Sequence, residues 1–122
     1  MKSYTDLEQS KKLAEILPIE SADMYYYTVN GDLYKTPNVI ESKDDLYVDK
    51  KSIPCWSLAA LFKVLPDTIT SNDGIAFKLN IKKNIIEYSN PSLYLIYKSV
   101  KSDNLVDACV EMILKLHELN LL

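Results

Sequence analysis

The alternation of apolar and polar residues over 75–82 is the feature that most constrains the fold of this chain. Apolar residues stand at every second position there, and lysine, asparagine or alanine fills the positions between them. Because successive side chains of a strand point to opposite faces of a sheet, this period predicts a strand with one buried and one solvated face. Residues 85–89 and 92–100, joined across Asn90-Pro91, predict two further strands of a meander. The last of these is apolar on both faces, which is typical of a central strand.

An Asn-Gly pair predicts a β-hairpin nearer the N-terminus. Asn30 and Gly31 stand between two runs rich in tyrosine and valine. A type I′ turn needs positive φ at both central residues, and this pair is the strongest short signal for it. The pattern predicts strands at 24–29 and 32–36. The polar, acidic stretch that follows predicts a loop with a short edge strand at 46–48.

Two helices are predicted in the first half of the chain. The first covers residues 6–16, with Thr5 as N-cap and Glu8 three positions later in the pattern of a capping box. The second has Pro54 in its first turn, where the missing N–H is not needed, and ends at Pro66. Its apolar residues cover most of the circumference, which predicts a deeply buried helix.

The best amphipathic helix lies at the C-terminus, with Asp103 or Asn104 as its N-cap. The order of elements predicts an α+β protein. We expect an antiparallel sheet of about five strands, made of the hairpin and the three-stranded meander, with three helices packed mainly on one face. A length of 122 residues suits a single domain over 1–122.

Charge and composition disfavour several classes of function. All 14 basic residues are lysine, and with 17 acidic residues the net charge is −3. Without arginine, the usual fork for phosphate and guanine, we expect no nucleic-acid partner. Two glycines cannot build a phosphate-binding loop, and no cofactor is expected. No apolar run approaches the ~20 residues of a membrane helix, and the N-terminus carries no export signal, so we expect a cytoplasmic protein without membrane contact.

Cysteine and histidine offer the only reactive candidates. Cys55 lies at the predicted start of the second helix, where the macrodipole favours a thiolate that His117 could activate. The structural alternative is a Cys55 packed beside Trp56, and a His117 that interacts with the C-terminal dipole of its helix. Cys109 lies on an apolar stripe and is expected in the core. One histidine and two isolated cysteines do not make a structural zinc site, so no metal is expected.

Tyrosine is the oddest part of the composition. The chain has nine tyrosines against two phenylalanines, which implies many rings with one end in water. Alternation puts Tyr25 and Tyr27 on one face of a strand, with Tyr26 on the other. We expect a candidate interaction surface that includes Tyr25, Tyr27, Tyr34 and Tyr94. The alternative is that these rings simply cover the edge of the sheet.

Four segments of the chain resemble a group of short uncharacterised proteins encoded by anaerobic gut bacteria and their phages or mobile elements. The segments are TDLEQSKKLAEILP, ESADMYY, IPCWSLAALFKVL and DACVEMILKLHELNLL, and the similarity covers nearly the whole chain. That group carries no known function, so the resemblance implies a single intracellular domain and supplies no catalytic residues that could be carried over to this chain.

These observations favour a protein without enzymatic activity. The leading hypothesis is a small interaction module that acts through a protein partner or through self-association, and it predicts an exposed aromatic or aliphatic patch. One alternative is a small thiol-dependent enzyme or sensor that uses Cys55. Another is an acidic phage-type inhibitor of a host factor, although a net charge of −3 gives only a weak field.

Overall fold

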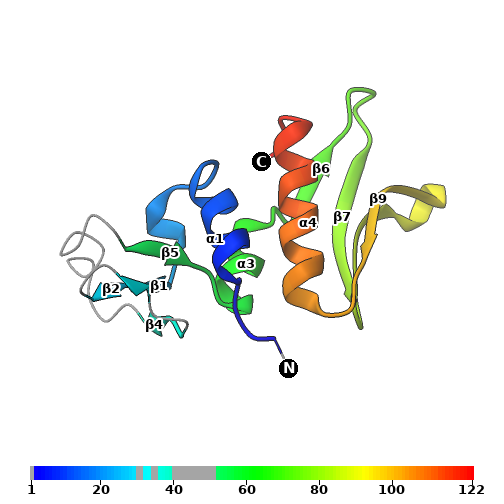
Figure 1. Cartoon of the computed structure of the whole chain (residues 1–122). Coiled ribbons are helices and arrows are strands. Elements are labelled where there is room, and N and C mark those ends of the chain that lie inside the picture. Colours follow the sequence, from blue (N-terminus) through cyan, green and yellow to red (C-terminus); the bar gives the residue numbers. More distant parts are fainter. Residues whose placement is uncertain (1, 30–31, 34–35, 40–51) are drawn as a thin grey trace. The chain divides into compact units, whose positions relative to one another are not determined.

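The computed structural model describes residues 2–29, 32–33, 36–39 and 52–122. The chain divides into two compact units (Figure 1), which we call the N-terminal unit (Ser3–Lys63) and the C-terminal unit (Val64–Leu122, with Lys2). Each unit contains an antiparallel sheet of its own. The described residues therefore form an α+β structure, as the element order predicts, with three α-helices. The expected single sheet of about five strands is wrong. A single domain over 1–122 stays a prediction.

The N-terminal unit is built from short elements. In chain order they are α1 (Leu7–Ala14), the 3-10 helix η1 (Ile19–Ser21), β1 (Met24–Tyr26), β2 (Thr28–Val29), β3 (Asp32–Leu33), β4 (Asn38–Val39), β5 (Ile53–Cys55) and α3 (Leu58–Val64). A three-stranded sheet has the order β4-β1-β5, and β2 pairs with β3 separately. Its buried side chains come from α1, α3, β1, β5 and the segments that connect them, and they include Thr5, Ser10, Leu13, Leu17, Ala22, Tyr26, Cys55, Trp56, Ala60 and Leu61.

The predicted hairpin is present, and its first strand, β2, is shorter than expected. Thr28 pairs with Leu33 and Val29 with Asp32, on either side of the Asn-Gly pair. The turn itself and the predicted edge strand at 46–48 lie outside the described residues. The first half of the expected strand, β1, pairs with β4 and β5 instead. The predicted strand 24–29 is therefore two strands, because its first part pairs with β4 and β5 and its last part pairs with β3.

The first helix is capped one residue later than predicted. Asp6 is the N-cap: its carboxylate accepts from the Gln9 backbone N–H at 2.8 Å, and the Gln9 side chain accepts from the Asp6 N–H at 3.1 Å. Thr5 does not cap the helix because its hydroxyl lies inside the unit, 2.7 Å from the Ser10 hydroxyl. A capping box is present, but the expected pair of Thr5 and Glu8 is wrong.

Pro54 lies in a strand and not in a helix. In β5 it stands opposite Tyr25 of β1. β5 is an edge strand of the described sheet and has a neighbouring strand on one side only. A proline, which lacks the backbone N–H, is tolerated in such a strand because no further strand needs that hydrogen bond on the unpaired side. The helix α3 starts at Leu58, directly after Ser57. The Ser57 hydroxyl accepts a hydrogen bond from the Ala60 N–H at 3.2 Å. The predicted helix start at Pro54 is therefore wrong.

The C-terminal unit combines one sheet with one long helix. Its elements are β6 (Thr68–Thr70), β7 (Ala76–Lys82), β8 (Ile85–Asn90), the 3-10 helix η2 (Pro91–Leu93), β9 (Leu95–Lys101) and α4 (Leu105–Glu118). The strands follow in the order β6-β7-β8-β9, all antiparallel, and α4 packs against β8 and β9. The buried residues of this unit are Leu65, Ile69, Phe77, Ile86, Tyr88, Val100, Val106, Ala108, Cys109, Val110, Met112, Ile113 and Leu116.

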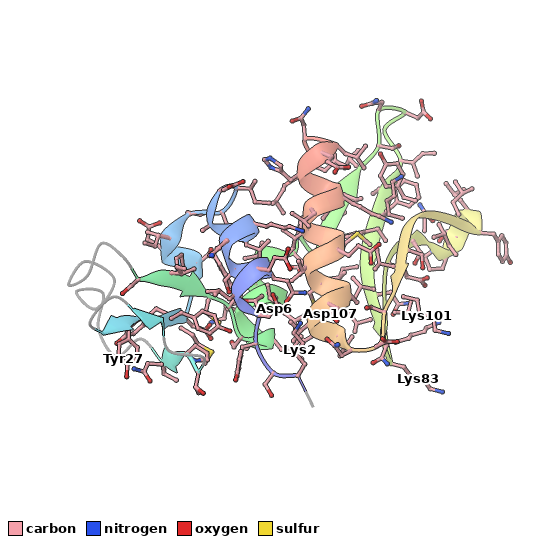
Figure 2. The ribbon with its side chains drawn as sticks, in the orientation of Figure 1. Lys2, Asp6, Tyr27, Lys83, Lys101 and Asp107 are labelled. Atoms are coloured by element: carbon pink, nitrogen blue, oxygen red, sulfur yellow. The ribbon has the colours of Figure 1, made fainter. Side chains whose placement is uncertain are left out.

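The helix α4 begins where the sequence predicts. The Asn104 side chain accepts from the Asp107 N–H at 2.9 Å, which makes Asn104 the N-cap. Asp107 in turn accepts from Lys2 at 2.7 Å (Figure 2). Cys109 is fully buried, which confirms its predicted place in the core.

The last strand is not central. Within the described residues β9 pairs with β8 on one side only and forms an edge of the sheet. The expectation of a central strand rested on its apolar character on both faces, and it is wrong. The strand also begins at Leu95 and not at Ser92, because residues 91–93 form η2.

Candidate functional site

Four consecutive apolar side chains are exposed at the start of the edge strand. Leu93 is 52% exposed, Tyr94 94%, Leu95 42% and Ile96 62%. We call these residues the 93–96 run. A run of this length on a surface is disfavoured unless it has a function, since it exposes apolar area and invites association. The 93–96 run is therefore the strongest candidate site among the described residues.

The turn that presents the run is built by its own sequence. The Asn90 side chain accepts from the Leu93 N–H at 3.2 Å and donates to the Ala76 carbonyl at 3.0 Å. Pro91 opens the 3-10 turn, and its carbonyl accepts from the Tyr94 N–H at 3.2 Å. Tyr94 then takes the left-handed region, with φ of 55°. For a residue other than glycine this costs roughly 1 kcal/mol.

The edge strand changes its pairing register beside the run. Tyr88 stands opposite Lys98, but Ser89 stands opposite Ile96, so Tyr97 is an extra residue in β9. The Tyr97 ring lies against Phe77, with ring centroids 5.1 Å apart. This bulge turns Ile96 toward the face of the sheet opposite the buried core. Bulges on edges commonly re-aim side chains in this way.

The other predicted tyrosines are divided among different places. Tyr25 and Tyr27 belong to the N-terminal unit, where they are half-buried and their ring centroids lie 6.0 Å apart. Tyr26 between them is buried. Tyr34 lies outside the described residues. Of the four tyrosines predicted for an interaction surface, Tyr94 is the one that the structure places in a strongly exposed apolar run.

Cys55 has a structural environment. It is fully buried, its thiol donates to the Thr5 carbonyl at 3.4 Å, and the Thr5 hydroxyl donates to its sulfur at 3.5 Å. Burial raises the pKa of the Cys55 thiol, although hydrogen bonds from Thr5 and Ser10 oppose the shift. Because Cys55 lies in β5, the expected helix dipole is not there to favour a thiolate. His117 is exposed in the last turn of α4 and belongs to the other unit.

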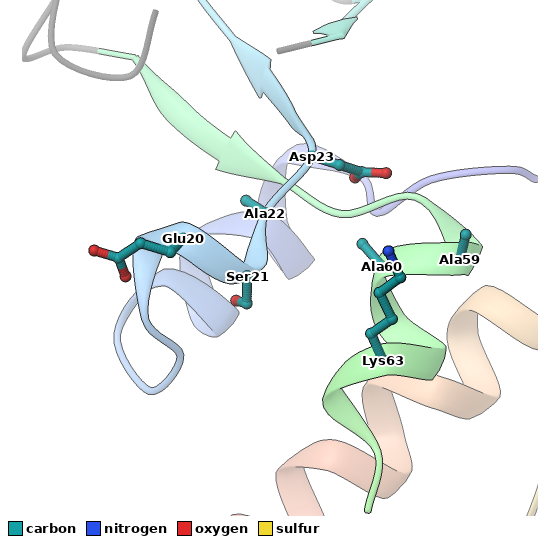
Figure 3. A pocket seen from close by; sticks show the side chains of 7 residues that line it. All are labelled: Glu20, Ser21, Ala22, Asp23, Ala59, Ala60 and Lys63. Carbon is teal, nitrogen blue, oxygen red and sulfur yellow. The ribbon is translucent and has the colours of Figure 1, made fainter. Parts of the chain in front are cut away.

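A pocket of about 390 Å³ lies in the N-terminal unit, between η1 and α3 (Figure 3). Its lining consists of Glu20, Ser21, Ala22, Asp23, Ala59, Ala60 and Lys63. Two of its polar groups are already engaged: Asp23 accepts from the Ser57 N–H at 2.8 Å, and Ser21 accepts from the Trp56 indole at 2.9 Å. Figure 3 shows the Glu20 carboxylate turned away from Lys63. The pocket thus offers no thiol or imidazole for catalysis.

Metal ligands do not gather in the part of the chain that the structure describes. No three histidine, cysteine, aspartate or glutamate side chains lie close enough there to hold a metal ion. None of the described helices is long and apolar enough to cross a membrane.

Sequence reasoning found Tyr94 but missed Leu93, Leu95 and Ile96. The apolar character of these residues predicts a central strand, in which they would be buried and not exposed. The turn residues Asn90 and Pro91 directly before the run were the signal that this strand starts at a corner. Comparison with known proteins gives no guidance, since no family model, no curated protein and no solved structure matches the chain.

Proposed function

We propose that this protein is a small, non-enzymatic interaction module that binds a protein partner, or a second copy of itself, through the 93–96 run and the edge of β9. The observation that carries the proposal is the exposure of four consecutive apolar side chains where the chain passes from η2 into the edge strand β9. We propose the cytoplasm as the place where it acts.

Strand addition is the mode of binding that this geometry favours. An edge strand offers unpaired backbone N–H and C=O groups, and an extended segment of a partner can satisfy them. Side-chain specificity then comes from the residues beside the edge, here Tyr94 and Ile96. Burial of two such side chains supplies binding energy at about 25 cal/mol for each Å² removed from water. Tyrosine is also enriched among the residues that dominate binding energy at protein interfaces.

The test compares two variants that each replace an exposed apolar residue by lysine. Ile96→Lys adds a charge to the 93–96 run, whereas Val39→Lys changes a residue that is 65% exposed in the other unit. Light scattering after gel filtration measures self-association. Affinity capture from cells that express the protein, followed by hydrogen exchange with the purified partner, measures partner binding.

We expect Ile96→Lys to abolish the association and Val39→Lys to leave it intact. Amide exchange along β9 should slow in the complex. A partner that binds both variants equally well, with unchanged exchange in β9, would show that the module works through another surface. Catalytic turnover that depends on Cys55 would show that the protein is a thiol-dependent enzyme and not a binding module.

A further inference from the structure

We infer that the segment bound at β9 is acidic: an extended stretch of a protein partner with apolar residues beside the 93–96 run and carboxylates near the other end of the strand. This inference rests on the proposed function and names the chemistry of the partner. It is carried by the distribution of lysines over the sheet of the C-terminal unit, which an acidic chain of net charge −3 does not lead one to expect.

The strands around the edge are locally basic. Between Ala76 and Lys101 the chain has five lysines, and Glu87 is the sole acidic residue. None of these lysines forms an ion pair with a described carboxylate. Glu87 instead accepts a hydrogen bond from the Asn80 side chain at 3.3 Å. The five lysines are Lys78, Lys82, Lys83, Lys98 and Lys101.

The pairing register places several of these charges at one end of the sheet. Lys82 stands opposite Ile85, and Ile85 stands opposite Lys101, so both lysines lie in one row on the face turned away from the core. The next residue, Lys83, forms the turn between β7 and β8 with a positive φ of 49°. Figure 2 shows Lys83 and Lys101 at the same end of the sheet. Three lysines, Lys82, Lys83 and Lys101, thus lie at this end of the sheet.

The turn that carries Lys83 is held in place beside this strand end. The Asn84 side chain donates to the Asp103 carbonyl at 3.0 Å, and the Asn84 carbonyl accepts from the Ser102 N–H at 3.2 Å. These hydrogen bonds fix the backbone of the turn, so the positions of the lysines along the chain do not depend on a bound partner.

The edge strand joins an apolar end to a basic end on the same face. Ile96 and Lys101 both project to the outer face, with Ser99 between them. At about 3.3 Å for each residue, Ile96 and Lys101 lie about 17 Å apart, a span that six to eight residues of an extended peptide cover. A complementary strand therefore has apolar side chains opposite Ile96 and aspartate or glutamate opposite Lys101, the lysine of β9 whose row across the sheet also holds Lys82. Opposite charges across paired strands stabilise them, and like charges destabilise them.

Two other occupants fit less well. A second copy of β9 paired antiparallel about its central residue would place Lys98 against Lys98 and Leu95 against Lys101. A nucleic acid would use the lysines but would leave the aliphatic side chains of the 93–96 run without a role. An acidic, partly apolar segment uses both ends of β9.

The experiment uses synthetic eight-residue peptides that carry a fluorescent label, with anisotropy as the readout. Each has an apolar half of alternating valine and threonine and a charged half, in both chain directions. The charged half contains glutamate, glutamine or lysine. The protein variants are Lys82→Gln/Lys101→Gln, Ile96→Lys, and Lys115→Gln as the control, which removes one positive charge from α4 in place of the two that the double variant removes from the sheet. An eight-nucleotide single-stranded DNA is the competing polyanion, and light scattering tests for dimers.

We expect the glutamate peptide to bind with a dissociation constant at least tenfold lower than that of the lysine peptide. That preference should shrink in Lys82→Gln/Lys101→Gln and at high salt, and persist in Lys115→Gln. If all three peptides bind equally and Ile96→Lys abolishes binding, the acidic preference is wrong while the interaction module stands. Three other outcomes would overturn the inference that an acidic segment binds at β9. They are that none of the peptides binds, that DNA binds more tightly than the glutamate peptide, or that the protein forms a dimer that Ile96→Lys disrupts. Failure of the module itself is decided separately, by capture and hydrogen exchange with Ile96→Lys and Val39→Lys.

Discussion

The Tyr26 hydroxyl donates a 2.8 Å hydrogen bond to the backbone carbonyl oxygen of Thr5, and both side chains are buried. Thr5 is also bound to Trp56, the residue that follows β5: the Thr5 N–H donates to the Trp56 carbonyl at 2.9 Å, and the Thr5 hydroxyl accepts from the Trp56 N–H at 3.1 Å. The hydroxyl lies 2.7 Å from that of Ser10 in α1. One threonine therefore joins the sheet of the N-terminal unit to its first helix.

Replacing Thr5 by valine should destabilise the N-terminal unit by about 2–3 kcal/mol. Valine keeps the shape of the side chain, but it leaves the buried Trp56 N–H and Ser10 hydroxyl without their partner, and an unsatisfied buried polar group is expensive. Urea unfolding followed by the fluorescence of Trp56, the single tryptophan, measures the change. Thr5→Ser keeps the hydroxyl and should cost about 1 kcal/mol. Equal losses in both variants would mean that packing, and not the hydrogen bonds, holds Thr5.

Ser57 and Asp23 should be energetically coupled. Asp23 accepts from both the N–H and the hydroxyl of Ser57, while the same hydroxyl accepts from the Ala60 N–H at the start of α3. Ser57→Ala should cost about 1 kcal/mol through loss of the helix cap. In a double-mutant cycle with Asp23→Ala, the two losses should fall short of additivity by about 0.5–1 kcal/mol. Strict additivity would show that the carboxylate does not depend on the hydroxyl. Urea titrations of the four proteins supply the data.

The sequence predicts the C-terminal unit better than the N-terminal unit, because its contacts are local. Strands β7, β8 and β9 follow one another, and α4 carries a regular apolar stripe, so period and caps are enough to find them. In the N-terminal unit β1 pairs with β4 and β5, which come from distant segments. Pro54 shows the consequence: a proline before an apolar run predicts a helix start unless the distant strand partner is known.

The candidate site was half visible in the sequence for a related reason. An apolar strand is equally compatible with a central and an edge position, since the pattern records side chains and not the number of neighbouring strands. Tyr94 drew attention through composition alone. Ile96 did not, because its exposure depends on the bulge at Tyr97, and a change of register is a property of the paired strands.

Stability should fall steeply in alkaline solution. Burial raises the pKa of Cys109 to about 12 and raises the pKa values of Cys55, Tyr26 and Tyr88. Above about pH 9 these groups ionise in the unfolded chain but stay protonated in the folded one, so the unfolded state binds fewer protons and gains stability. The free energy of unfolding should then fall by about 1.4 kcal/mol for each pH unit and each group that is titrating.

The control for the pH dependence is a variant that lacks one of these groups. Urea titrations from pH 7 to pH 11, followed by circular dichroism, give the slope of stability against pH. Cys109→Ala should lower stability at pH 7 and flatten the slope above pH 9. An unchanged slope in this variant would mean that the Cys109 thiol is accessible to water in the native protein.

The native protein should resist thiol reagents until it unfolds. Cys55 and Cys109 are both fully buried, and burial raises both pKa values, so neither accessibility nor thiolate character favours reaction. With Ellman's reagent near pH 7.5, the two free cysteines should react slowly in buffer and fully in urea. Tyr94→Cys provides the matched positive control, because residue 94 is 94% exposed and should react at the rate of a free thiol. The same reaction should slow when a partner covers the 93–96 run. Rapid reaction of Cys55 in the native wild-type protein would instead favour a thiol-dependent activity.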